Sequence, residues 1–290
     1  MDKKDFRIIT STNEVDLYLN FWSTMSQNWS KWYGIDKVTC AFITEREEDD
    51  PLVLEMKKYG EIILFKPFNN EIPSGIQTKT TRMYLSTQYP DEYCLIADID
   101  MYILNKEETW DKWFSKVEED KLLCVSSNVP YGGTDKGKFP MAFTTAKGSV
   151  WEEIINPKGL SYLELFKSWY DVRVHDTKEK VNQPFTNFSD ESLLRGLISK
   201  WEGYGGREAY KHPRCIGIER DDWGKGKKGF KGAARRIDRS RWGFDKEKLN
   251  KGYYYDSQPL RPFTNNINEI KPILEYLDIN SNDWVLNEKK

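Results

Sequence analysis

The stretch Cys94–Leu104 reads CLIADIDMYIL and places two aspartates inside a run that is otherwise apolar. Two ionised groups in such a run are costly to bury unless they are paired or bind a metal ion. In an extended backbone, residues i and i+2 point to the same side, so Asp98 and Asp100 would share one direction while Ile99 points into the sheet. The stretch therefore predicts a strand that ends in a two-pronged acidic site.

The segments around this stretch alternate between two kinds of periodicity. Apolar runs typical of buried strands lie at 6–10, 38–44, 61–68, 93–104 and 121–128. Between them, apolar residues recur at helical spacing over 15–29, 52–59, 76–89 and 107–120. Strands separated by helices of this length indicate an α/β fold with a mainly parallel sheet, and such sheets bind ligands at the carboxyl ends of their strands.

Beyond about residue 130 the pattern is less regular. We expect a strand at 139–146 and helices at 149–156, 161–170 and 190–201. The segment 224–241 reads GKGKKGFKGAARRIDRSR, in which eight basic residues accompany the single acid Asp238, and it predicts a mobile loop. Because no internal repeat is visible, we expect one domain over residues 1–290, with a regular half at about 1–128 and a less regular half at about 129–290.

Composition limits the classes of function. The 290-residue chain has a formal net charge of -2 and a pI near 5.9, so no overall positive field favours a nucleic-acid partner, and we predict none. No apolar run reaches the roughly 18 residues that span a bilayer, and the first residues lack the core of a signal peptide. The sequence therefore predicts a cytoplasmic protein without a transmembrane segment.

The stretch TKTTRMYLSTQYPDEYCLIADIDMYIL (78–104) resembles the core of the GT-A fold glycosyltransferases. In that family a helix with basic residues precedes an apolar strand that ends in a DxD motif. The likeness covers residues 6–128 and implies a single GT-A-like, Rossmann-related domain whose sheet is flanked by helices. It implies a metal-dependent hexosyl- or pentosyltransferase, with a nucleotide-sugar donor bound by the first half and a carbohydrate or glycoprotein acceptor bound by the second.

The resemblance also implies roles for particular residues. A Mn²⁺ or Mg²⁺ ion would lie between the DxD motif and the donor diphosphate, with Asp98 near the ribose or the metal and Asp100 as the firmer metal ligand. Residues expected to bind the donor nucleotide or its phosphates are Thr10, Ser11, Thr12, Lys79 and Arg82. For Arg82, a charge on the helix surface is an equal alternative.

The third metal ligand is open. Many GT-A enzymes use a histidine near the C-terminus, but this chain has only His175 and His212, and the segment YYYDSQPLRPF (253–263) has none. Asp256, Gln258 or water are the alternatives there. For either histidine, a structural role is the simpler interpretation.

The segment FTNFSDESLLRGL (185–197) places Asp190 and Glu191 after a polar turn and before an apolar helical run. One interpretation is a helix cap formed by Ser189 or Asp190. GT-A enzymes often carry an acidic residue at such a helix start, and in inverting members it takes the proton of the acceptor hydroxyl. The resemblance therefore implies a catalytic or acceptor-binding role for Asp190 or Glu191.

Two other functions suit the same residues. Paired aspartates at a strand end also occur in metal-dependent nucleotidyl or phosphoryl transferases, although the predicted strand at 121–128 supplies no further acid. A binding module without catalysis would instead use aromatic residues to hold glycans and the basic segment to hold phosphate or nucleic acid. Turnover of a nucleotide-sugar would distinguish an enzyme from such a module.

Overall fold

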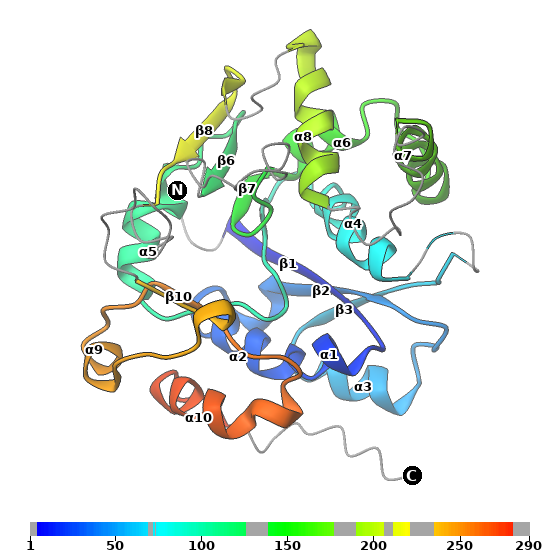
Figure 1. The fold of residues 1–290 in the computed structure, drawn as a ribbon. Helices are drawn as coiled ribbons and strands as arrows, with labels where there is room; N and C mark the ends of the chain where they lie inside the picture. Colours follow the sequence, from blue (N-terminus) through cyan, green and yellow to red (C-terminus); the bar gives the residue numbers. More distant parts are fainter. Residues whose placement is uncertain are drawn as a thin grey trace.

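The computed structural model describes residues 5–68, 72, 74–125, 139–176, 190–205, 211–220 and 235–280, and only the backbone of 170–176 and 241. Its centre is a seven-stranded sheet in the order β3-β2-β1-β4-β7-β6-β8 (Figure 1). The strands are β1 (Phe6–Asn13), β2 (Val38–Ile43), β3 (Glu61–Phe65), β4 (Tyr93–Ile96), β6 (Leu122–Val125), β7 (Thr144–Lys147) and β8 (Cys215–Ile218). All pairs are parallel except those of β7, which is antiparallel to β4 and β6.

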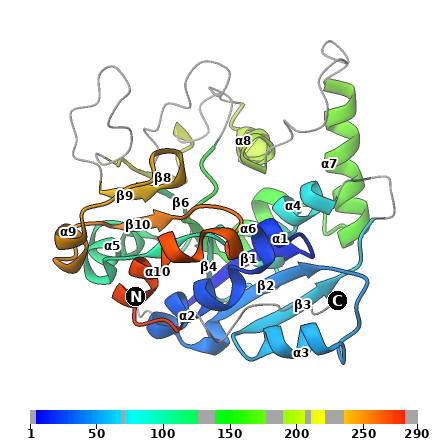
Figure 2. The same ribbon diagram turned by 60° about the horizontal axis from the view of Figure 1, so that its bottom comes forward.

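Alternate side chains of the central strands enter two hydrophobic cores. On β1, Ile8 packs into one core and Ile9 into the other, as the two-residue period of a strand requires. Helices α2 (Trp22–Tyr33), α3 (Pro51–Lys57) and α10 (Ile267–Tyr276) cover the first core, and α4 (Ser74–Ser86), α6 (Gly148–Ile155), α7 (Tyr162–Asp176) and α8 (Asp190–Lys200) cover the second. Figures 1 and 2 show the two sets on opposite sides of the sheet, which confirms the predicted α/β class with a mainly parallel, helix-flanked sheet.

Two predicted helices are each divided. The helix expected at 15–29 is α1 (Asp16–Leu19) followed by α2, and the helix expected at 107–120 is α5 (Lys106–Lys112) followed by a 3₁₀ turn at Phe114–Lys116. The strand expected at 139–146 begins only at Thr144, because Phe143 has a left-handed backbone (φ 65°) that a strand does not accommodate.

The prediction of one strand over 93–104 is wrong. Strand β4 ends at Ile96, and the amide of Met101 donates to the Asp98 carbonyl oxygen at 3.1 Å, which closes a turn over the two aspartates. The chain then enters β5 (Tyr102–Ile103), which belongs to a second sheet. Asp98 and Asp100 are therefore not alternate residues of an extended strand, and their shared direction does not follow from a strand's period.

The second sheet has three strands in the order β5-β10-β9, with β9 at Arg236–Asp238 and β10 at Asp256–Gln258. The prediction that all of 224–241 is a mobile loop is therefore wrong for residues 235–241, whereas 224–234 lie outside the described residues. The reason is Ile237, which is buried in the first core while the neighbouring Arg236 pairs with Asp238 and Asp256. Helix α9 (Lys246–Asn250) connects β9 to β10.

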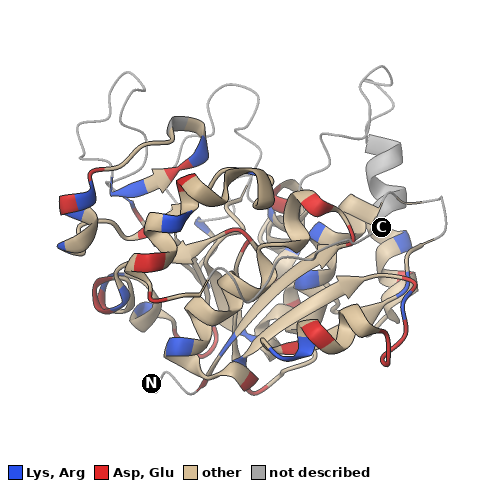
Figure 3. Cartoon of the chain, turned by 90° about the horizontal axis from the view of Figure 1, so that it is seen from below, with Lys and Arg blue, Asp and Glu red and all other residues tan. Residues whose placement is uncertain are grey.

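Charge is spread over the described chain, with Lys and Arg interleaved with Asp and Glu (Figure 3). All four cysteines are free. In the described ranges, every helix is too short or too polar to cross a lipid bilayer.

Candidate functional site

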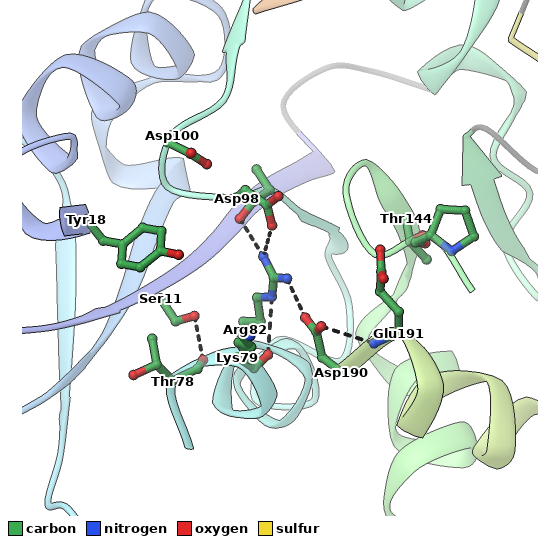
Figure 4. A network of polar contacts seen from close by, with 12 residues as sticks. Ser11, Tyr18, Thr78, Lys79, Arg82, Asp98, Asp100, Thr144, Asp190 and Glu191 are labelled. Carbon is green, nitrogen blue, oxygen red and sulfur yellow. Dashed lines mark hydrogen bonds and ion pairs between the residues drawn. The ribbon is translucent and has the colours of Figure 1, made fainter. Parts of the chain in front are cut away.

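The aspartates of the DID stretch lie where several elements meet (Figure 4). Asp98 follows β4, Arg82 projects from α4, and Asp190 begins α8. The small sheet contributes Gln258 from β10 and, just after β9, Arg239. The site thus forms at the carboxyl ends of β1 and β4, where open parallel sheets bind ligands.

Arg82 joins Asp98 to Asp190. Its Nη1 lies 2.6 Å from Asp98 Oδ1, and its Nη2 lies 2.5 Å from Asp190 Oδ2. Both Arg82 and Asp190 are buried, so the interpretation of Arg82 as a helix-surface charge is wrong. The second oxygen of Asp190 accepts the amide of Glu191 at 3.0 Å. Both oxygens of Asp190 are therefore bonded within the protein.

Electrostatics keep Arg82 and Asp98 charged. Burial alone would lower the pKa of Arg82, but Asp190 and Asp98 outweigh burial and raise the pKa above its ordinary value. Burial alone would raise the pKa of Asp98, but Arg82 outweighs it and the pKa falls below the usual range of an aspartate. Asp98 and Arg82 are therefore an ion pair at neutral pH.

Asp100 lies beneath two further arginines. Its Oδ2 is 2.8 Å from Arg239 Nη1 and 2.5 Å from Arg261 Nε. The Asp100 side chain is 1% exposed, whereas those of Arg239 and Arg261 are 33% and 18% exposed. The two arginine side chains are therefore more exposed than the carboxylate that they share. Arg261 also donates to the Tyr18 hydroxyl at 2.7 Å and stacks on the Tyr18 ring.

Gln258 turns its amide nitrogen towards both aspartates. Its Oε1 accepts from Arg236 Nη2 at 2.7 Å, and because an arginine only donates, this bond fixes which amide atom faces the aspartates. Its Nε2 lies 3.4 Å from Asp98 Oδ2 and 3.4 Å from Asp100 Oδ1. Asp256 is fully buried and pairs with Arg220 and Arg236. Arginines therefore bond the oxygens of both side-chain alternatives for the third metal ligand, Asp256 and Gln258.

The predicted nucleotide-binding residues of the first strand lie inside β1 rather than after it. Thr10 and Thr12 are fully buried, and Ser11 donates to the Thr78 carbonyl oxygen at 2.6 Å, which ties β1 to α4. The reason is that β1 runs on to Asn13, whose side chain reaches Ser74 on α4. Ser11 lies beside the site in Figure 4.

Lys79 and Glu191 lie at the border of the site. Lys79 is exposed on α4, one turn before Arg82, and its carbonyl oxygen accepts from Arg82 Nε at 3.3 Å. The Glu191 side chain extends towards Thr144 of β7 and away from the Asp190 carboxylate (Figure 4). Glu191 is therefore not part of the Arg82 ion pairs.

The histidines do not extend this site. His212 is buried, stacks on Trp201 with ring centroids 4.4 Å apart, and accepts the amide of Arg214 through Nδ1 at 3.1 Å. His175 lies on α7, and its side chain is outside the described residues. Within the described ranges, no three His, Cys, Asp or Glu side chains form a group that could hold a metal ion.

The residues around Asp98 and Asp100 do not fit a resident divalent cation. Such a cation needs oxygen lone pairs, but guanidinium groups hold one oxygen of each carboxylate, and the Gln258 amide nitrogen faces the other two. Unit charges 4 Å apart repel by about 4 kcal/mol at an effective dielectric constant near 20, and a dication doubles this for each guanidinium. A cation would therefore compete with Arg239 and Arg261 for Asp100.

Sequence reasoning missed Arg261 and Tyr18, and it did not pair Arg239 of the basic segment 224–241 with the DID aspartates. A signal was present in 224–241, where the first four basic residues are lysines and the last four are arginines. Arginine is the better residue for buried ion pairs because its planar fork matches a carboxylate. The arginine cluster after residue 234 therefore differs from the lysine cluster before it and favours ion pairs with buried carboxylates, but the pattern does not identify which carboxylates.

Comparisons with known proteins bear on the fold. No protein-family model and no curated protein matches this chain. Among solved structures, the chain is similar to the galactosyltransferase LgtC in complex with donor and acceptor sugar analogues, with 11% identity, a TM-score of 0.50 and 98% of each chain covered. It is also similar to the glycosyltransferase GlyE of Streptococcus pneumoniae TIGR4, with 13% identity, a TM-score of 0.43, and coverage of 74% of this chain and 46% of GlyE.

The chain thus spans less than half of GlyE but nearly all of LgtC. At these identities the likeness concerns the fold alone. The fold of this chain is that of LgtC, a glycosyltransferase, as predicted from the DID stretch and the helix before it.

Proposed function

We propose that this protein is a glycosyltransferase that binds a nucleotide-sugar donor at the carboxyl ends of β1 and β4 and transfers its sugar to an acceptor hydroxyl. The observation that carries the proposal is the set of solvent-facing guanidinium groups over Asp100, at the edge where a fold of this kind binds ligands. The likeness to LgtC supports the same class of reaction.

Transfer of a sugar from a nucleotide-sugar needs positive charge beside the departing diphosphate. In the transfer, the bond between the anomeric carbon and the diphosphate oxygen breaks, and a bond to the acceptor oxygen forms. Negative charge builds on the departing nucleoside diphosphate, so fixed cations beside it lower the barrier. Arg239 and Arg261 are held by Asp100 and reach solvent, which suits them for this role. The carboxylates of Asp98 and Asp100, where Mn²⁺ or Mg²⁺ was predicted, are paired with arginines, and no step of this proposal depends on a metal ion.

The acceptor side would be formed by the second half of the chain. Asp190 is bonded to Arg82 and to the Glu191 amide, so we assign it the positioning of Arg82. Glu191, on the first turn of α8, is then the stronger candidate for taking the proton of the acceptor hydroxyl. Thr10, Thr12 and Lys79 stay predictions for the nucleotide pocket, with Ser11 as their neighbour in the site.

A thermal-shift panel tests the proposal. Nucleoside diphosphates and nucleotide-sugars are each mixed with the full chain, and we expect at least one to raise the melting temperature, because a ligand of the folded state stabilises it. Asp100→Asn should lose this shift, whereas Asp278→Asn, at a fully exposed aspartate, should keep it.

Turnover assays separate the alternatives. Release of free sugar, or its transfer to an added saccharide, is expected of a glycosyltransferase. Release of a nucleoside monophosphate would point to nucleotidyl or phosphoryl transfer, and binding without turnover would point to a glycan- or nucleotide-binding module. Absence of any shift across the whole panel would contradict the proposed function.

A further inference from the structure

We propose that Arg239 and Arg261 take the place of the divalent cation in this site and bind the donor diphosphate directly. The inference rests on the proposed function and deepens it, because it states how the chain recognises its donor. In this account Asp100 is not a metal ligand. It is a positioning residue that holds two arginine side chains, each more exposed than its own carboxylate.

The geometry at Asp100 leaves N–H donors of both arginines for a further ligand. Both guanidinium groups bond the same oxygen of Asp100, at 2.8 Å from Arg239 Nη1 and 2.5 Å from Arg261 Nε. A guanidinium has five N–H donors, so each group keeps donors beyond the bond to Asp100. In the described part of the chain, Arg239 makes no other hydrogen bond, and Arg261 makes one more, to Tyr18. An arriving phosphate can therefore be bound without breaking either pair.

The charged side chains around Asp100 differ in burial. The Asp100 carboxylate is buried, and its two arginines lie outside it. An anion that enters from solvent meets guanidinium groups first. A cation that enters meets the same groups and has to displace them before it reaches Asp100. The site is therefore arranged for an anionic ligand.

The described charges of the ion-pair network around the DID stretch balance one another. Its described members are five aspartates and five arginines, so its formal charge is zero: Asp98, Asp100, Asp190, Asp238, Asp256, Arg82, Arg220, Arg236, Arg239 and Arg261. Among the described residues, the carboxylates therefore need no added cation for neutrality. In a site that depends on a metal, the carboxylates would carry the uncompensated charge that the metal neutralises.

Gln258 presents a hydrogen-bond donor to both aspartates. Arg236 fixes its carbonyl oxygen, so its amide nitrogen faces Asp98 and Asp100 at 3.4 Å. A primary amide nitrogen donates hydrogen bonds and does not ligate Mg²⁺ or Mn²⁺. The two carboxylate oxygens left over by the arginines thus face a donor, in a position where a metal site would offer an acceptor.

The experiment is calorimetric titration of the full chain with UDP, GDP, ADP and CDP, each with Mn²⁺ and each with EDTA. We expect the best ligand to bind in EDTA with a dissociation constant within about threefold of its value in Mn²⁺. Arg239→Ala and Arg261→Ala should each weaken binding in EDTA by about 10-fold to 100-fold. Arg214→Ala is the matched control, because Arg214 also bridges two carboxylates, Glu153 and Glu202, outside this site.

Each outcome decides the question. Binding that requires Mn²⁺ and is lost in EDTA overturns the inference while the proposed function stands. No binding of any nucleotide in either condition overturns the proposed function and the inference with it. If either alanine variant melts at a much lower temperature than the wild type, Arg239→Lys and Arg261→Lys replace it. These keep a charge but lose the planar fork, and unchanged affinity in both would also overturn the inference.

Discussion

The central strands carry an arginine network at each end, and the two networks are ordered in opposite ways. At the amino ends, Arg7 of β1 lies 2.8 Å from Glu61 and 2.9 Å from Glu92. There the arginine side chain is 10% exposed and the glutamates are 40% and 24% exposed. At the carboxyl ends the carboxylate of Asp100 is inside and its arginines reach solvent.

This difference separates a structural network from one that can bind a ligand. Arg7 also donates to the Asp36 carbonyl oxygen and to Thr39, so one guanidinium ties together the starts of β1, β2, β3 and β4. Its donors are used within the protein. At the other end, Asp100 is the buried member, and Arg239 and Arg261 are the more exposed members. The first network stabilises the sheet, and the second offers positive charge to an anion.

The largest effect on stability should come from Arg82→Met. This change leaves the buried Asp190 and the partly buried Asp98 without their shared guanidinium, and an uncompensated buried charge costs about 3–5 kcal/mol. Denaturation in urea at neutral pH measures the loss. Arg214→Met, at a more exposed arginine, should lose less than about 1 kcal/mol, and equal losses in the two variants would contradict this account.

A smaller loss of stability is expected for Arg7→Met, at about 2 kcal/mol, because water can solvate Glu61 and Glu92 once the arginine is gone. The nucleotide affinity of the folded variant should equal that of the wild type. Urea denaturation and calorimetric titration together check the prediction. A loss of nucleotide affinity at unchanged stability would reverse the roles assigned to the two networks.

Arg239→Ala should show the opposite pattern. Asp100 keeps Arg261, so the free energy of unfolding should fall by no more than about 1 kcal/mol, while nucleotide affinity falls. The same two measurements apply. A stability loss as large as that of Arg82→Met would mean that Arg239 has a structural role instead of a ligand-binding one.

The smallest effect is expected at a more exposed pair near the outer edge of the small sheet. Hydrogen bonds from Arg235, and also from Lys112 and Tyr255, stabilise the ionised Glu108. They outweigh the effect of burial and lower the pKa of Glu108 to about 2. A lowered acid pKa adds stability above the unfolded pKa of about 4.3 that is lost as pH falls towards 2. Glu108→Gln should therefore be less stable than the wild type by about 1 kcal/mol at pH 7. The difference should vanish near pH 2, and a gap that persists there would contradict the assignment.

The parts of this molecule that depend on local pattern were predictable. The order of strands and helices through β6 follows from apolar periodicity, and the DID aspartates and Arg82 were identified because they lie within 18 residues of one another in a recognisable order. Asp190 was identified from its place before an apolar helical run. Its bond to Arg82 spans 108 residues and was not predicted.

The pairing of Arg239 and Arg261 with Asp100 was not predicted because it is long-range. Arg239 and Arg261 lie 139 and 161 residues beyond their carboxylate, and a single sequence gives no sign of such contacts. The same pairs explain the error over 93–104. Because Arg239 and Arg261 compensate the charge of Asp100, the chain can turn at the aspartates. Its apolar pattern nevertheless continues through Leu104, which is why a single strand was predicted.

The most direct measurement is a crystal structure of the protein with the nucleoside diphosphate that raises its melting temperature most, grown without divalent cations. We expect the diphosphate at the carboxyl ends of β1 and β4, with its oxygens within hydrogen-bond distance of Arg239 and Arg261 and with Asp100 still bonded to both. A diphosphate bound elsewhere on the molecule, or one that binds only through a cation with both arginines turned away, would contradict the account.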